Sequence, residues 1–355
     1  MTWFKCIKVN IAILLFLPSI FTNSTSAQFD PVFSLVASPT TDVRDVAISH
    51  DGNKILTVVD DLKIWDSQTG ERLATYSDPN VRVIFSAAFS TDDTLIATGD
   101  AGHNAIIWDA RTGLIMHRLP SYDMNPLNGG IRGVAFTPDG NRLLVGNGNG
   151  ALQLWDVRTG VEIKRYRNYD HIISLLMLPD GNRAVIWREG AIMIIDINNY
   201  DAIDNPAIIV IDGAYPSISS HGKILQIRAG TRLVGYRIQQ WDLNTYTLIR
   251  EYALDPSQRI GVATISPDGH EFLIGAYINP DTTTVFNRTL FESATRNSLR
   301  QYPVDRASAS NSPLSQDSII KYFPNGRRFL TVNNGTVHIW DISDVVTKVE
   351  DAFLH

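Results

Sequence analysis

The side chains that most often carry out chemistry, histidine, cysteine and the carboxylates, are spread along this sequence without a grouping that points to a reaction. Of the eight histidines in the 355 residues, none stands at metal-ligand spacing from another histidine or from the one cysteine, Cys6. The sequence also lacks a Gly-x-Ser-x-Gly nucleophile turn, a P-loop and a Rossmann glycine motif. We therefore predict no catalytic residue, no metal and no cofactor.

A different spacing dominates the chain. A segment of alternating apolar residues ending in Trp-Asp, followed by a Thr-Gly turn, returns at intervals of roughly 45 residues. The clearest copies read LKIWDSQTG (62–70), AIIWDARTG (105–113) and LQLWDVRTG (152–160). The Trp-Asp pairs are Trp65-Asp66, Trp108-Asp109, Trp155-Asp156, Trp241-Asp242 and Trp340-Asp341, and Ile195 and Phe291 take the Trp position in two weaker copies.

A second element precedes each of these seven positions. It reads ISHDG (48–52), FTPDG (136–140) or ISPDG (265–269) in its clearest forms, an apolar strand end that runs into an Asp-Gly turn. Asp-Gly and Asn-Gly between alternating apolar runs are the strongest short-range signals of a β-hairpin. Each repeat is thus predicted to form four short strands, named a to d in chain order.

One four-stranded sheet of this size cannot bury both of its faces, but seven sheets arranged radially can cover one another. The Trp position, at the end of strand c, is expected to fill the space between neighbouring sheets. The last repeat has no recognisable strand d, whereas VFSLVAS (32–38) is a strand without its own a, b and c. We therefore predict an all-β, seven-bladed propeller over residues 28–341, closed by pairing of this N-terminal strand into the last blade.

With these features the sequence resembles the WD40-repeat β-propeller family, of which it would be a secreted, divergent member. The likeness covers roughly residues 32–341. Family blades often carry a Gly-His near their start and an Asp in the b–c turn, joined to the Trp by hydrogen bonds. Here that Asp position holds Asn149, Glu189 or Asn334, and the one Gly-His pair, Gly102-His103, lies in a b–c turn. We therefore expect apolar packing to replace the polar network.

The two ends of the chain are predicted to lie outside the propeller. Lys5 and Lys8 precede the apolar run 11–21, and small residues follow as far as Ala27, which is typical of a cleaved secretory signal peptide over 1–27. A membrane anchor would need about 20 apolar residues, more than this run supplies. We expect a secreted, periplasmic or otherwise extracytoplasmic protein, with residues 342–355 as a C-terminal tail that forms a short helix or competes for the last strand-d position.

Unequal loops suggest where the propeller binds. The longest connections, 120–130, 229–237, 276–284 and 303–317, all belong to the rim formed by the b–c and d–a loops, and repeat scaffolds usually place recognition in such loops. Neutral drift of exposed loops is the alternative. Interface-type residues on this rim are Tyr122, Asp123, Tyr236, Arg237 and Tyr277. The resemblance adds Arg44 and Arg132, which share one register at the start of strand a, where family members border the mouth of the central channel. The alternative is that both are ordinary solvated charges.

These expectations favour a non-enzymatic scaffold that binds a protein or peptide through the b–c/d–a loops. With a net charge of −6 and no long basic run, a nucleic-acid partner is not expected, nor is a membrane span in the mature chain; we expect a monomer. One alternative is a propeller hydrolase or lyase with two carboxylates at the channel mouth, for which Asp45 and Asp170 are the nearest acids. Another is a periplasmic TolB-like accessory propeller, whose repeats also carry Ser-Pro-Asp-Gly.

Overall fold

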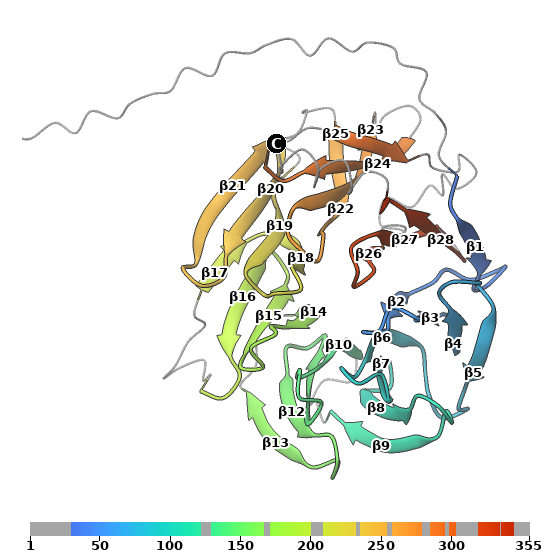
Figure 1. The fold of residues 1–355 in the computed structure, drawn as a ribbon. Coiled ribbons are helices and arrows are strands. Elements are labelled where there is room, and N and C mark those ends of the chain that lie inside the picture. Colours follow the sequence, from blue (N-terminus) through green and yellow to red (C-terminus); the bar gives the residue numbers. More distant parts are fainter. Residues whose placement is uncertain are drawn as a thin grey trace, which may run out of the picture.

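The computed structural model describes residues 30–121, 129–166, 171–199, 209–231, 235–253, 258–278, 285–294, 298–302, 319–333 and 335–343. The predicted signal peptide, 1–27, and nearly all of the predicted tail, 342–355, lie outside these ranges. The described residues form seven four-stranded antiparallel sheets arranged around a common centre (Figure 1). The prediction of an all-β, seven-bladed propeller is therefore confirmed.

The first strand of each blade lies nearest the centre of the ring and the last strand lies at its outer edge (Figure 1). Blades one to three consist of β2–β5 (Asp45–Ile48, Lys54–Val58, Leu62–Asp66, Arg72–Tyr76), β6–β9 (Ile84–Phe89, Leu95–Asp100, Asn104–Asp109, Ile115–Pro120) and β10–β13 (Ile131–Phe136, Arg142–Asn147, Leu152–Asp156, Glu162–Tyr166). Blades four and five consist of β14–β17 (Ile172–Met177, Arg183–Arg188, Ala191–Asp196, Ile209–Asp212) and β18–β21 (Ala214–Ile218, Ile224–Thr231, Gly235–Asp242, Thr247–Ala253). Blades six and seven consist of β22–β25 (Gln258–Ile265, Glu271–Ile278, Val285–Glu292, Ser298–Tyr302) and of β26–β28 (Ile320–Tyr322, Arg328–Asn333, Thr336–Asp341) with β1 (Phe33–Val36).

The middle strands of the blades are buried on both faces, which explains their nearly continuous apolar sequences. In β7, LIATGD, and in β11, RLLVGN, every residue after the first is buried. The outermost strands instead alternate between covered and exposed residues, as in β13, EIKRY. A strand covered by a neighbouring blade on each side needs apolar residues throughout, whereas an edge strand needs them only on alternate positions.

Seven separate apolar clusters fill the boundaries between neighbouring blades, including the boundary between blade seven and blade one. Each residue at the Trp position belongs to the cluster shared with the preceding blade. Trp108 packs between blades one and two, Trp155 between two and three, and Trp340 between six and seven. The tryptophans are thus part of the apolar core that joins the blades.

The N-terminal strand β1 lies at the outside of blade seven. It pairs antiparallel with β28, with Phe33 opposite Ile339 and Val36 opposite Thr336. Leu35 of β1 joins Trp65 of blade one in the same apolar cluster. On the same boundary, the guanidinium of Arg328 donates to the backbone carbonyl of Ser67 at 2.7 Å. Segments from the two ends of the described chain thus lie side by side.

The Trp-Asp-x-x-Thr-Gly sequence builds the c–d turn. In blade three the Asp156 carboxylate accepts hydrogen bonds from the backbone N–H and the hydroxyl of Thr159, both at 2.7 Å. These bonds hold the pKa of Asp156 below its usual value. The glycine that ends the turn adopts a positive φ, +71° at Gly113 in blade two. There, the ring of Tyr76 from the preceding blade lies where a β-carbon would be.

In several blades a tyrosine near the end of strand d links one blade to the next. The Tyr76 hydroxyl donates to the carbonyl of Ala110 at 2.9 Å, and the Tyr166 hydroxyl donates to the carbonyl of Ile197 at 2.5 Å. Both acceptors lie in the c–d turn of the next blade. Tyr at this position therefore makes the same kind of inter-blade hydrogen bond in blades one and three.

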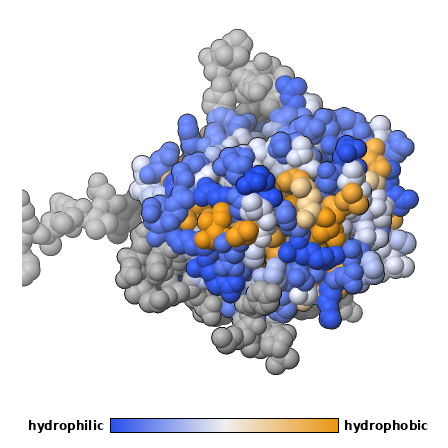
Figure 2. Space-filling view, turned by 90° about the horizontal axis from the view of Figure 1, so that it is seen from below, coloured by the Kyte–Doolittle hydropathy of each residue, from blue (hydrophilic) through white to orange (hydrophobic). Residues whose placement is uncertain are grey.

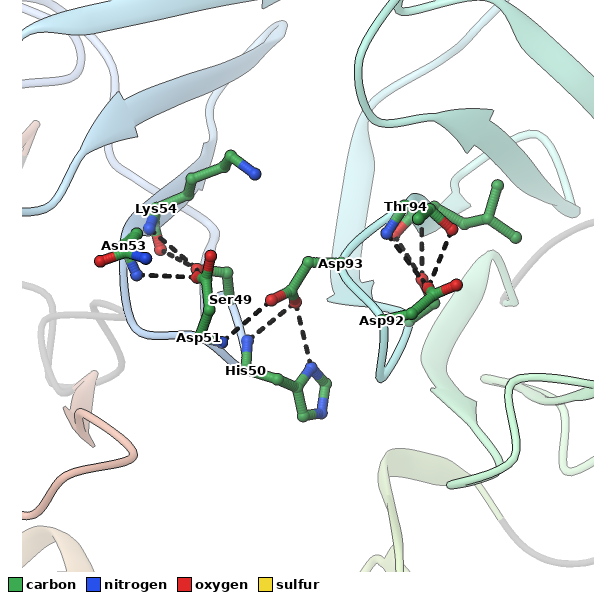
Figure 3. A network of polar contacts seen from close by, with 10 residues as sticks. Ser49, His50, Asp51, Asn53, Lys54, Asp92, Asp93 and Thr94 are labelled. Atoms are coloured by element: carbon green, nitrogen blue, oxygen red, sulfur yellow. Dashed lines mark hydrogen bonds and ion pairs between the residues drawn. The ribbon is translucent and has the colours of Figure 1, made fainter.

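The a–b turn of blade two departs from the others, because Asp93 stands where the other turns carry glycine. Its φ is +58°, in the left-handed region. The Asp93 carboxylate reaches the a–b turn of blade one, where it accepts hydrogen bonds from the backbone N–H groups of His50 and Asp51 at 2.8 and 2.9 Å (Figure 3). The two bonds offset the cost of this backbone conformation and fasten blades one and two together.

The tryptophan side chains are not held by apolar packing alone, which corrects one expectation from the sequence. The indole N–H groups of Trp65, Trp108 and Trp340 each donate, at 2.9 Å, to a threonine hydroxyl on strand b, namely Thr57, Thr98 and Thr331. In blade three the same position holds Val145, and the buried indole N–H of Trp155 has no hydrogen-bond partner in the described structure. Part of a polar network is therefore retained, without the Asp of the b–c turn.

Candidate functional site

The rim formed by the b–c and d–a loops, called here the variable rim, differs from blade to blade. In blade five the extra residues lengthen the b–c hairpin, whose pairing continues to Thr231 opposite Gly235. In blade six the pairing of β23 and β24 likewise continues to Ile278 opposite Val285. In the described residues the two insertions therefore begin as two-stranded extensions of the blades, and side chains on strands are positioned more precisely than side chains on loops.

Arg44, one of the two arginines predicted to border the channel mouth, is occupied by its own blade. Its guanidinium donates to the backbone carbonyl of Val59 and forms an ion pair with the Asp60 carboxylate, with 3.3 Å between the nitrogen and the oxygen. Its side chain is 21% exposed. The charge of Arg44 is thus largely neutralised within the b–c turn of blade one.

Arg132 occupies the same register in blade three but has different surroundings. It lies at a β-bulge between Ile131 and Gly133, which takes its side chain out of the regular alternation of the strand. Its guanidinium carbon lies 3.9 Å from the centre of the Phe85 ring in blade two. Its Nε is buried and has no hydrogen-bond partner among the described residues. Burial lowers the pKa of the Arg132 guanidinium.

A second group on the variable rim, called here the aromatic cluster, joins blades four and five. The Arg228 guanidinium carbon lies 4.6 Å from the Tyr215 ring centre and 5.2 Å from the Tyr236 ring centre. The Trp187 ring of blade four meets the Tyr215 ring at 4.7 Å between centres. Tyr215 has a φ of +53° within an irregular part of the β18–β19 pairing, and such conformations in bulky residues concentrate at functional sites.

Of the remaining predicted site residues, one is held by an ion pair, and the side chains of the others lie outside the described part. Arg237, next to Tyr236, forms an ion pair with Glu251 on the neighbouring strand at 3.2 Å. Tyr277 belongs to β23, but its side chain lies outside the described part. Tyr122 and Asp123 lie outside the described residues altogether. Among the predicted residues that are described, the structure brings Tyr236 together with residues that were not predicted and gives no contact between Arg44 and Arg132.

Four residues of the variable rim were missed by the sequence analysis, namely Phe85, Trp187, Tyr215 and Arg228. Phe85 could have been found, because it lies five residues before Ser90 just as Arg44 and Arg132 lie five residues before Ser49 and Thr137. The other three come from strands a and b of two blades, and their contact depends on how those blades are placed. No spacing in the sequence indicates that contact.

Other surfaces of the described structure offer less chemistry. No group of three or more histidine, cysteine or acidic residues within it is placed to hold a metal ion, and none of its helices is long and apolar enough to cross a membrane. Seen from the side where β9 and β13 form the outer edge, apolar areas are separated by hydrophilic ones (Figure 2). Exposed apolar side chains there include Met116 and Ile163. Scattered apolar residues of this kind are ordinary on protein surfaces.

Comparison with known proteins agrees with the geometry of the blades. The family model for "WD domain, G-beta repeat" matches residues 70–109 and 122–156. A curated relative, "Eukaryotic translation initiation factor 3 subunit I" of Phaeosphaeria nodorum, is 32% identical over 75 residues, which are 21% of this chain and 22% of the relative. The match thus spans about a fifth of either protein. The chain thus carries two segments that match the WD40 repeat within a β-propeller of seven four-stranded blades.

Proposed function

We propose that this protein is a non-enzymatic scaffold that binds a protein or peptide through the variable rim. The main support is Arg132 on this rim. This arginine is partly buried, is stacked on Phe85 and has no polar partner among the described residues. The aromatic cluster on the same rim adds Tyr, Trp and Arg side chains, the types enriched in binding hot spots. Rigid strands hold all of them, so little conformational entropy is lost when a partner binds.

The comparisons support the same class of function. WD40 propellers typically bind other proteins, and the relative from Phaeosphaeria nodorum is named as a subunit, hence as one component of a larger assembly. Because the similarity covers only 75 residues, it supports a role in protein association and does not carry over the process in which the relative takes part. We expect this chain to be a monomer before it meets its partner.

We also propose that the protein acts outside the cytoplasm, after cleavage behind Ala27. The support is the basic start, the apolar run and the small residues of 1–27. Expression of the full chain in a secreting host, followed by N-terminal sequencing of the protein in the medium, tests this directly. A first residue of Gln28 is the expected result, and retention of the protein inside the cell with Met1 intact would refute export.

A capture experiment tests the binding face. The chain from residue 28 is immobilised and exposed to extracellular material, and the proteins that it retains are identified by mass spectrometry. A variant with Arg132→Glu and Tyr236→Ala should lose a retained protein that the wild type captures. The matched control is Arg111→Glu with Arg158→Glu, two exposed arginines on the c–d turns of the opposite rim. Loss of capture with the control variant, and not with the first, would move the site to that rim.

A further inference from the structure

Arg132 stands out among the arginines of the described structure by how its charge is used. Several partly buried arginines have a carboxylate within ion-pair distance, such as Asp60 for Arg44, Asp180 for Arg183 and Glu251 for Arg237. Others donate to backbone carbonyls, such as Arg328 to Ser67. Arg132 is partly buried as well, but it has neither kind of partner among the described residues.

A difference between repeats explains why Arg44 has a carboxylate partner that Arg132 lacks among the described residues. In blade one the carboxylate that neutralises Arg44 comes from Asp60, three residues after Thr57 on strand b. The corresponding residue of blade three, three after Val145, is Gly148. Thr57 and Val145 are equivalent, because each pairs with the residue two positions before the Trp of its blade. Blade three thus has the arginine, but a glycine stands where the counter-ion of Arg44 stands in blade one.

The guanidinium is nevertheless held in one place. The Phe85 ring supports one face of it at 3.9 Å. Gly130, just before β10, in turn runs close behind Phe85. A β-carbon at Gly130 would lie 2.8 Å from the Phe85 ring and 2.7 Å from the Cα of Ala101. The lack of a side chain at Gly130 therefore lets the backbone just before β10 pack against the aromatic ring that carries the arginine.

We propose that Arg132 receives a side-chain carboxylate from an acidic segment of a protein partner. This inference rests on the proposed binding function and names the chemistry of its ligand. A planar guanidinium offers two parallel N–H groups that match the two oxygens of a carboxylate. A phosphate carries nearly two negative charges and is usually bound by several cationic groups, whereas the described structure places one arginine on Phe85. A single carboxylate would supply the charge that Asp60 supplies to Arg44.

Selection from a random-peptide phage library on the immobilised full chain tests this proposal. We expect the selected peptides to be enriched in Asp or Glu, and we expect Arg132→Ala to weaken their binding about 10- to 100-fold in fluorescence anisotropy, because a charge-assisted hydrogen-bonded pair is lost. Arg132→Lys should recover part of the loss, since lysine restores the charge without the planar fork. The matched control Arg44→Ala, at the same register in blade one, should have little effect.

The chemistry of the ligand is tested with three versions of one selected peptide, which carry the acidic residue, its amide or phosphoserine at the same position. The acidic version should bind wild type best, and Arg132→Ala should bind the acidic and amide versions equally. Tighter binding of the phosphoserine version would overturn the carboxylate assignment. If Tyr236→Ala weakens binding and Arg132→Ala does not, the scaffold function stands and this inference fails. If neither substitution matters, or no peptide is selected, both proposals fail.

Discussion

On the rim formed by the a–b and c–d turns, the repeated acidic side chains are used by the fold itself, whereas on the variable rim Arg132 has no polar partner among the described residues. Asp66, Asp109, Asp156 and Asp242 accept backbone hydrogen bonds from their own c–d turns. Asp93 does the same across a blade boundary. Arg132 instead rests on an aromatic ring.

The difference between the rims shows how a repeat protein separates structure from recognition. A polar residue that recurs in every blade is there because every blade needs the same turn, so its hydrogen bonds are already taken. Arg132 has no such hydrogen bond among the described residues, so it can be left for a ligand. The five Trp-Asp pairs are therefore structural, and we propose that residues such as Phe85 and Arg132 take part in binding.

The largest loss of stability is expected from substitutions of the repeated glycines in the turns. Gly113→Ala would place a β-carbon about 2.1 Å from the Tyr76 ring, at a φ of +71°. Backbone strain and overpacking together should lower the free energy of unfolding by about 3–4 kcal/mol. The control is Gly140→Ala, which has the same φ of +71° and nothing within 4 Å of the added carbon. It should cost about 1–2 kcal/mol, and equal losses in urea unfolding would refute the role of the Tyr76 contact.

A smaller effect is expected from the Trp–Thr hydrogen bonds. Thr98→Val removes the acceptor of the buried Trp108 indole N–H and should lower the free energy of unfolding by about 1–2 kcal/mol. Val145→Thr supplies the acceptor that Trp155 lacks and should raise the free energy of unfolding by up to about 1 kcal/mol, less the cost of burying the hydroxyl. If the denaturation midpoints of both variants move in the same direction, the Trp–Thr hydrogen bond does not contribute to stability as proposed.

The turn carboxylates predict how stability depends on pH. Hydrogen bonds from Thr112 and Thr159 lower the pKa of Asp109 and of Asp156 below 3.8, the value of an unperturbed Asp. A carboxylate whose pKa is lower in the folded than in the unfolded protein stabilises the folded state at pH values above its unfolded pKa. The contribution of these two carboxylates to the free energy of unfolding is therefore complete well above pH 4. It is lost as the pH falls below that value through the lowered pKa. Urea unfolding at several acidic pH values should show this decline.

The double variant Asp109→Asn with Asp156→Asn separates these two carboxylates from the other acids of the chain. Its stability should be lower than that of wild type at neutral pH and should fall less steeply in acid, because two of the groups that take up protons have been removed. If the free energy of unfolding of the variant falls with the same slope in acid as that of wild type, the two turn carboxylates do not cause the loss of stability at low pH.

The smallest effect on stability is expected at the two arginines of equal register. Arg44→Met removes an ion pair with Asp60 and a hydrogen bond to Val59, and should lower the free energy of unfolding by about 1 kcal/mol. Arg132→Met removes a partly buried charge that has no counter-ion among the described residues and keeps an apolar contact with Phe85, so the free energy of unfolding should change by no more than about 0.5 kcal/mol. A large loss for Arg132→Met would mean that its charge is already compensated in the fold.

Much of the fold could be predicted from the sequence because the turns are local. Asp-Gly hairpins, the Trp-Asp-x-x-Thr-Gly turn and alternating apolar runs depend on neighbouring residues, so they can be read without knowing the rest of the chain. The seven copies of the repeat then predicted seven blades. A ring was expected because each blade must be covered by a neighbour on either face. The Trp–Thr bonds were not predicted, although Thr57, Thr98 and Thr331 stand at one position of strand b.

The candidate site could be predicted only in outline. The unequal loops predicted the variable rim as the binding face, and the family resemblance together with a shared register made Arg44 and Arg132 candidates, but the two arginines were treated alike. Only the tertiary structure distinguished them, because the partner of each depends on which residue of another strand or blade lies within a few ångströms: Asp60 for Arg44, Phe85 for Arg132. The first contact depends on how the strands of blade one pair, and the second depends on how blades two and three pack.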